Sequence, residues 1–184
     1  MVSGPRITLG DLPPPARAIA TAVTDAVGAA QAGDAAAFED AAGRLGLADP
    51  EHVRVLLGDA VRLLLEELHP DGLDGDDLRD VTARCARAAA PWFPGVRPGA
   101  LVVVLAGALG VHPDTPPDGT RDDERAPEPD DPWSDVPLRL SPDDVARHAI
   151  VLLADLTGAR GRPLRGYLEA AFTELARRET VEQP

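Results

Sequence analysis

The stretch DPEHVRVLLGDAVRLLLEELHP, from Asp49 to Pro70, decides the fold class of this chain. Asp49 suits the cap of a helix and Pro50 suits its first position, whereas Pro70 prevents the helix from continuing. Between these signals, apolar side chains recur every three or four residues and therefore share one face of the helix. That face consists of Val53, Leu57, Ala60, Val61, Leu64 and Leu68. We predict an amphipathic helix between the two prolines.

The same periodicity extends over most of the remaining chain. Further helices are expected in the segments 16–31, 34–45, 74–89, 98–110, 141–158 and 162–179. The segment 98–110 carries a run of Val that would also suit a strand, but no other segment offers a strand partner. We therefore expect it to be a helix buried on all sides. Because 184 residues suffice for one well-buried core, we predict an all-α, helical-bundle-like domain of about seven helices spanning residues 1–184.

The composition restricts the core and the partners of this chain. Hydrophobic residues make up 44% but aromatic residues only 3%, so Leu, Val, Ile and Ala must fill a core of closely packed helices. The formal charge of −13 opposes binding to a nucleic-acid backbone. All eighteen basic residues are Arg, which is typical of a G+C-rich bacterial coding sequence.

The sequence indicates neither secretion nor membrane insertion. Cys85 is the only cysteine, which excludes an internal disulfide and a thiolate-based zinc site. The N-terminal segment lacks the basic and apolar regions of a signal peptide, and the longest apolar run, 100–111, is too short to span a bilayer. We predict a cytoplasmic protein that does not contact a membrane.

Residues 113–140 differ in composition from the rest of the chain. They contain seven Pro, nine Asp or Glu and three Arg. A segment of this composition buries too little apolar surface to offset the entropy lost when it becomes ordered. We predict a disordered, acidic, Pro-rich loop inserted before the last two helices.

The stretch EELHPDGLDGDDLRDV, from Glu66 to Val81, holds five Asp and one His, and it could be a metal site or a turn. A calcium-binding loop needs ligands at positions one, three, five and twelve. Counting from Asp71, the acidic residues fall at positions one, four, six, seven and ten. Asp74 can instead cap a helix, with Asp77 as its partner in a capping box. We interpret the stretch as the turn between two helices.

A metal-binding helical enzyme is an alternative interpretation. Glu66 and His69 form an E-x-x-H pattern of the kind found in carboxylate-bridged di-iron bundles, and His148 is the candidate for a second histidine ligand. Those sites use two such patterns, but His148 has no Glu three or four residues before it. No serine lies in a nucleophile elbow, and Cys85 falls on the apolar face of its helix. We expect no catalytic residue, no metal and no cofactor.

Three Arg residues lie close together between the last two predicted helices. Arg160, Arg162 and Arg165 fall within the sequence GARGRPLRGY. Arg160 could complement the end of a helix, with the other two side chains solvated. Guanidinium groups also bind carboxylates with two parallel hydrogen bonds. We take the three Arg as a candidate partner-binding patch for an acidic protein surface or for the chain's own acidic loop.

The sequence as a whole favours a non-catalytic protein-interaction or regulatory module, whose partner is another protein or a second copy of the chain. One alternative is the metal-binding enzyme built around Glu66, His69 and His148. Another is a helical sensor domain that binds a small molecule between its helices. Metal analysis would test the first alternative, and ligand-dependent melting would test the second.

We expect the acidic segment to be dispensable for folding. Replacement of residues 114–139 by a short Gly/Ser linker should leave helicity and cooperative melting nearly unchanged, because the free energy of loop closure varies slowly with loop length. Far-UV circular dichroism and thermal unfolding measure both properties. Loss of the folded state would show instead that the segment packs on the helices, with Trp133 and Leu138 as its anchors.

Overall fold

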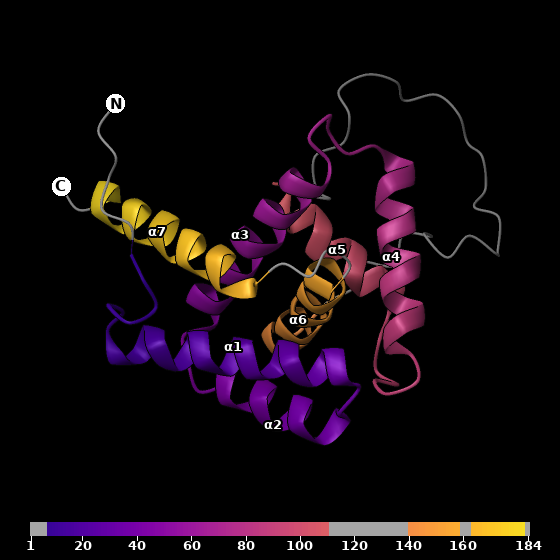
Figure 1. The fold of residues 1–184 in the computed structure, drawn as a ribbon, viewed down its shortest axis with the longest axis horizontal. Helices are drawn as coiled ribbons and strands as arrows, with labels where there is room; N and C mark the ends of the chain where they lie inside the picture. Colours follow the sequence, from indigo (N-terminus) through magenta and orange to yellow (C-terminus); the bar gives the residue numbers. More distant parts are fainter. Residues whose placement is uncertain (1–6, 111–139, 159–162, 183–184) are drawn as a thin grey trace.

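The structure, a computed structural model, describes residues 7–110, 140–158 and 163–182. Over these residues the chain forms seven helices and no strand, as the sequence predicts (Figure 1). The helices are α1 (Pro14–Ala32), α2 (Ala35–Leu45), α3 (Pro50–Leu68), α4 (Gly75–Ala89), α5 (Pro98–Ala108), α6 (Pro142–Gly158) and α7 (Leu164–Glu182). The predicted acidic loop, residues 113–140, precedes α6 and lies outside the described residues except for Leu140.

The helix α3 begins and ends where the sequence signals place it. The Asp49 carboxylate accepts hydrogen bonds from the backbone N–H groups of Glu51 and His52, both at 3.0 Å. Pro50 occupies the first position, where its missing N–H costs no hydrogen bond. The helix ends before Pro70, so the predicted amphipathic helix is confirmed.

The Asp-rich stretch after α3 is the predicted turn. Asp74 accepts hydrogen bonds from the backbone N–H groups of Asp76 and Asp77, both at 2.8 Å. The Asp77 carboxylate in turn accepts from the Asp74 N–H at 3.1 Å, which completes a capping box at the start of α4. These carboxylates also lie at the positive end of the helix dipole. The acidic residues of the turn therefore have a local structural role.

The helix α6 lies at the centre of the molecule and contacts α1, α2, α3, α4 and α5. Residues 148–154 are all buried, so no face of this part of α6 meets solvent. The start of α6 follows the predicted cap, because the Asp144 N–H donates a hydrogen bond of 3.1 Å to the Ser141 hydroxyl oxygen. The charged residues of α6 occupy positions near its two ends.

The prediction that residues 98–110 form a helix buried on all sides is only half right. The segment is helical, as α5, but Val103 on this helix is 37% exposed. The reason is that α5 contacts α3, α4 and α6, which leaves one side uncovered, whereas α6 is surrounded. Within the described ranges, no helix combines the length and the apolar character needed to cross a membrane.

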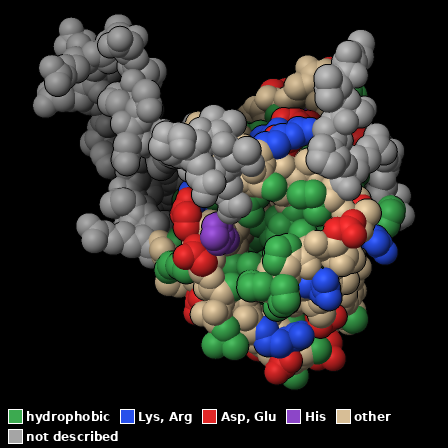
Figure 2. Space-filling model, turned by 90° about the vertical axis from the view of Figure 1, so that its left-hand side faces the viewer, with side chains coloured by type: hydrophobic (Ala, Val, Ile, Leu, Met, Phe, Trp, Pro, Cys, Tyr) green, Lys and Arg blue, Asp and Glu red, His purple; other side chains and the backbone are tan. Residues whose placement is uncertain are grey.

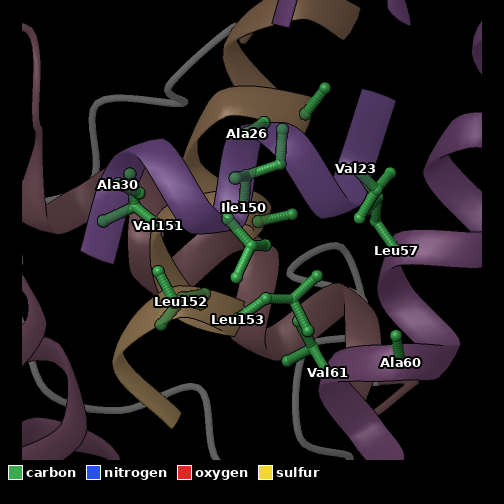
Figure 3. Close-up of a cluster of buried hydrophobic side chains, with 14 of the residues drawn as sticks. Val23, Ala26, Ala30, Leu57, Ala60, Val61, Ile150, Val151, Leu152 and Leu153 are labelled. Carbon is green, nitrogen blue, oxygen red and sulfur yellow. The ribbon is translucent and has the colours of Figure 1, made fainter. Parts of the chain in front are cut away.

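Small aliphatic side chains fill the contact between α6 and its neighbours. Figure 3 shows side chains of α1 and α3 converging on α6. The labelled residues are Val23, Ala26 and Ala30 of α1, Leu57, Ala60 and Val61 of α3, and Ile150, Val151, Leu152 and Leu153 of α6. All ten are buried. Because helix separation depends on the side chains at the contact, alanines at these positions allow close approach.

Arginine side chains connect neighbouring helices at the periphery. The pairs are Arg44–Asp25 (α2 to α1, 2.9 Å), Arg147–Glu39 (α6 to α2, 3.0 Å), Arg84–Asp155 (α4 to α6, 2.8 Å) and Arg178–Asp59 (α7 to α3, 2.8 Å). Exposed ion pairs contribute little to stability, so we interpret most of these contacts as fixing helix orientation. Asp59 differs because it is buried, and its Oδ2 atom has no hydrogen-bond partner among the described residues.

The central position of α6 predicts a large difference between substitutions on α6 and α5. Leu153→Ala on α6 should lower the free energy of unfolding by about 2–5 kcal/mol, because it leaves a cavity in the core. Val103→Ala on α5 removes a partly exposed side chain and should cost less than about 1 kcal/mol. Urea denaturation of both variants measures the difference. Equal losses would contradict the central role of α6.

Candidate functional site

The structure describes one of the three residues of the predicted arginine patch, Arg165. Arg160 and Arg162 lie outside the described residues. Arg165 lies in the first turn of α7, with 66% of its side chain exposed, and pairs with Glu169 at 2.9 Å. Glu169 also accepts a hydrogen bond from the Leu9 N–H, and its pKa is held below the ordinary value, chiefly by Arg165. Arg165 thus has a partner on its own helix while most of its side chain faces solvent.

The structure does not bring Glu66, His69 and His148 together into one site. Glu66 pairs with Arg62 at 2.9 Å on the surface of α3. The His69 ring lies 3.8 Å from the Asp77 carboxylate in the turn after α3, whereas His148 is buried in α6. In the part of the chain that the structure describes, no three His, Cys, Asp or Glu side chains form a group that could hold a metal ion.

Both ring nitrogens of His148 are engaged inside the protein. The Nδ1 atom lies 2.7 Å from the Asp144 carbonyl oxygen, and Nε2 accepts a hydrogen bond of 3.1 Å from the backbone N–H of Arg97. Because a carbonyl only accepts and a backbone N–H only donates, Nδ1 carries the proton and the ring is neutral. Burial lowers the pKa of His148 below its ordinary value of 6.5. This histidine therefore joins the start of α5 to α6.

Three of the six aromatic side chains of the protein, those of Phe38, Trp92 and Phe93, gather next to this histidine. The Phe38 ring lies 5.1 Å from that of Trp92 and 5.3 Å from that of Phe93, and the Phe93 ring lies 5.7 Å from that of His148. These residues come from α2, from the connection between α4 and α5, and from α6. The cluster holds that connection against the core.

A hollow, which we call the end groove, lies between the start of α1 and the connection from α2 to α3. Its volume is about 790 Å³, and its apolar lining consists of Pro14, Pro15, Ala18, Ile19, Leu47 and Ala48. This connection and the start of α1 lie at the left of Figure 1, the side that faces the viewer in Figure 2. Figure 2 shows hydrophobic surface gathered in a hollow on this side, with charged side chains and a histidine around it.

Leu47 projects from the edge of the end groove and is 89% exposed. The turn that carries it is tight, because the Leu47 N–H donates to the Arg44 carbonyl at 3.3 Å and the Ala48 N–H donates to the Leu45 carbonyl at 3.0 Å. Among the described residues, Leu47 and Val103 are the exposed large hydrophobic side chains. An exposed leucine beside an apolar hollow makes this surface a candidate interaction site.

The rim of the end groove carries charges of both signs. Arg17 donates hydrogen bonds to the backbone oxygens of Gly10 and Leu12 at 3.1 and 2.9 Å, which fixes its guanidinium near the start of α1. Arg44 also lines the groove and pairs with Asp25. Asp49 and His52 line the groove at the start of α3, and Thr21 of α1 is the remaining polar residue of the lining. The groove thus combines an apolar floor with a mixed polar rim, as protein interfaces do.

A second hollow, which we call the inter-helix groove, lies between the end of α1, α4 and the second half of α6. It has a volume of about 860 Å³, and small side chains such as Ala30, Ala88 and Ala154 line much of it. Trp92 forms part of one wall and packs against Gly33, which ends α1 with a φ of 69°. Any other residue at position 33 would strain this backbone.

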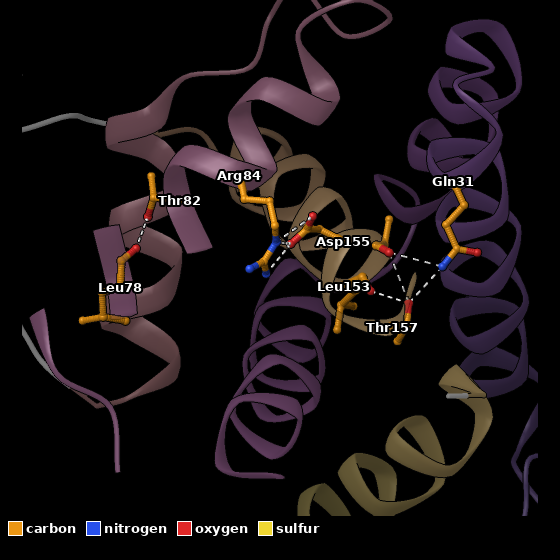
Figure 4. Close-up of polar contacts among 8 residues, drawn as sticks. Gln31, Leu78, Thr82, Arg84, Leu153, Asp155 and Thr157 are labelled. Carbon is orange, nitrogen blue, oxygen red and sulfur yellow. Dashed lines mark hydrogen bonds and ion pairs between the residues drawn. The ribbon is translucent and has the colours of Figure 1, made fainter. Parts of the chain in front are cut away.

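The polar residues of the inter-helix groove satisfy one another, as Figure 4 shows. Arg84 donates two hydrogen bonds to Asp155 Oδ2, at 3.0 and 2.8 Å. The Gln31 side-chain amide donates to Thr157 Oγ1 at 3.0 Å and to the Ala154 carbonyl at 3.2 Å. These contacts tie α4 and α1 to the end of α6.

Cys85 also lines the inter-helix groove, but its thiol is not reactive. The side chain is fully buried, as the sequence predicts for the apolar face of this helix. Burial raises the pKa of the thiol to about 12. The thiolate is the nucleophilic form of cysteine, so Cys85 stays protonated and inert near neutral pH.

In comparisons with protein-family models, with curated proteins and with solved structures, this chain matches none of them.

Sequence reasoning located neither groove, although it left open a small-molecule site between the helices. The spacing of apolar residues along a helix identifies the buried face of that helix, but it does not show which other helix packs there. It therefore cannot predict that Gln31 contacts Thr157, which lies 126 positions later in the chain. Leu47 offered a signal that could have been used. It is a large apolar residue in a short helix connection, GLADP, where polar residues are the rule.

The neutral state of His148 predicts a specific loss of stability in weak acid. As the pH falls through about 6.5, the unfolded chain binds a proton at this residue more readily than the folded chain does, so the free energy of unfolding must fall as the pH falls. The slope should approach about 1.4 kcal/mol per pH unit for one proton. Measurement between about pH 7.5 and pH 5.5 avoids the carboxylates, which titrate at lower pH.

His148→Gln provides the matched variant for this experiment. It should lower stability at neutral pH by about 1–3 kcal/mol, because a buried hydrogen bond is lost. It should also flatten the dependence on pH in this range. An unchanged slope in the variant would assign the effect to another group.

Proposed function

We propose that this protein is a non-catalytic protein-interaction module that binds its partner through the end groove. The observation that supports the proposal is Leu47, 89% exposed beside an apolar hollow of about 790 Å³. Its exposure costs hydration free energy in the isolated chain, and burial by a partner recovers roughly 1.5–3 kcal/mol for a side chain of this size. A few side chains in well-packed, dehydrated pockets contribute most of the affinity in protein interfaces, and we assign Leu47 that role here.

The partner in this proposal is a protein in the cytoplasm. The formal charge of −13 opposes a nucleic acid, and the apolar floor of the groove suits side chains better than phosphates. Basic partners would also be attracted over longer distances, which raises the rate of association. Arg160, Arg162 and Arg165 form a second candidate contact, with the exposed guanidinium of Arg165 as its described member.

A small-molecule sensor is the second candidate function. The inter-helix groove supports it, since about 860 Å³ lies within the usual range of ligand sites and Trp92 provides an aromatic wall. A ligand that binds there would stabilise the folded chain and raise its melting temperature. Screening small molecules by thermal shift tests this alternative independently of the end groove.

The interaction proposal predicts that Leu47→Asp abolishes partner capture. The chain should be expressed with an affinity tag in its native host, and the proteins that co-purify should be quantified by mass spectrometry. A charge in the hollow should reduce specific partners at least about tenfold, the effect expected for an interface anchor. The melting temperature should stay close to that of the unchanged chain, because Leu47 contributes little to the core.

Val103→Asp is the matched control, because it places the same charge on the other exposed large hydrophobic residue of the described chain. Partner capture should survive this change. A triple change of Arg160, Arg162 and Arg165 to Glu tests the arginine patch in the same assay. Full capture by folded Leu47→Asp protein would reject the end groove, and loss in the triple variant alone would assign the interaction to the arginine patch.

A further inference from the structure

We propose that the end groove binds a second copy of this chain, so that two molecules form a symmetric dimer. This inference rests on the proposed function and names the partner. In a two-fold dimer the same surface of each copy faces the other, so that surface must carry both a projecting group and a hollow to receive it. The end groove has both within one short stretch of surface.

Leu47 is the projecting group and the floor around Ala18 and Ile19 is the hollow. Leu47 stands on the α2–α3 connection, whereas Ala18 and Ile19 belong to α1. Because Leu47 and the hollow lie on different elements, Leu47 of one copy can enter the hollow of the other copy while all helices of both copies stay folded. Two such contacts form at once in the dimer, one on each side of the two-fold axis.

The rim charges also suit pairing between identical surfaces. Arg17 and Arg44 are cationic and Asp49 is anionic, and all three line the groove. A surface with one sign of charge would repel its own copy, whereas a mixed surface can place unlike charges opposite each other across a two-fold axis. The Arg44–Asp25 pair is exposed, so Arg44 can exchange its partner at low cost. Asp49 can keep its two cap hydrogen bonds, both at Oδ1, because a carboxylate has further acceptor sites.

The charge of the whole molecule gives the dimer a characteristic salt dependence. Each copy carries a formal charge of −13, so two copies repel each other over distances beyond the contact itself. Salt screens this repulsion and also the exposed rim contacts, which contribute little, but it hardly weakens the apolar contacts. Raising the salt from about 0.05 M to about 0.5 M should therefore strengthen the dimer. Contacts through the arginine patch to an acidic surface would weaken under the same change.

Sedimentation velocity of the purified full chain over a range of concentrations tests the proposal. The unchanged protein should show a reversible monomer–dimer equilibrium that tightens with salt. Leu47→Ser removes the projecting group, and Ala18→Phe fills the hollow of an otherwise intact surface. Each variant alone should dimerise at least about tenfold more weakly, because each loses both apolar contacts. Ala83→Phe, an equal change at an exposed position of α4 outside the groove, should dimerise normally.

A mixture of the two variants distinguishes a symmetric dimer from general loss of binding. Leu47→Ser protein keeps the hollow and Ala18→Phe protein keeps the leucine, so a mixed pair can form one of the two contacts. The mixture should therefore associate more strongly than either variant alone. Ser is used here because it removes the side chain without adding a charge that would oppose the mixed pair.

Three results would overturn the dimer. They are a monomeric unchanged chain at all concentrations and salt levels, undiminished dimers in either groove variant, and a mixture that associates no better than its components. The interaction proposal is judged separately, by the capture of other proteins. If the pure chain is monomeric while Leu47→Asp still abolishes that capture, the end groove binds a different protein and only the dimer is rejected.

Discussion

The burial of α6 on all sides is the constraint on which the rest of the structure depends. A helix that meets no solvent in its central turns must carry side chains that need none, and residues 148–154 are apolar except for His148. The one polar ring in this run has both nitrogens satisfied, by a carbonyl of its own helix and by the chain entering α5. The five helices that contact α6 thus pack around its apolar central turns. Two of the charged residues of α6, Arg147 and Asp155, form ion pairs that orient α2 and α4.

The exclusive use of arginine as the basic residue suits this architecture. Guanidinium groups present several donors in a rigid plane, so one side chain can hold a carboxylate on a neighbouring helix with more than one hydrogen bond. Arg84 does this with Asp155 across the inter-helix groove. Arg178 reaches the buried carboxylate of Asp59 from the far end of α7. An alanine-rich core leaves the helices close together, and the arginines then connect their outer edges.

The sequence predicts the elements of this fold better than their arrangement. The caps at Asp49, Asp74 and Ser141 form over a few residues, and these local hydrogen bonds place the helix starts correctly. Which helix becomes the central one cannot be predicted in this way, because it depends on how the apolar faces of several helices pack against one another. Asp59 shows the same limit. It lies on the buried side of α3, where Arg62 of the same helix is 3.6 Å away, but its shorter ion pair is with Arg178 of α7, which helical periodicity could not predict. Both grooves arise from such neighbour relations, so helical periodicity alone could not place them.

The position of α6 in the chain also determines the order in which the protein can fold during its synthesis. Translation produces α1 to α5 first, but the helix around which they pack begins only at Pro142. Contacts such as Gln31 to Thr157 join residues 126 positions apart, and long-range contacts of this kind form slowly. Until α6 leaves the ribosome, the apolar side chains of α1 and α3 that pack against α6 stay uncovered, although α2 and α5 can already cover other parts of these helices. Until α6 has been synthesised, the nascent chain therefore exposes apolar surface of the kind that promotes aggregation.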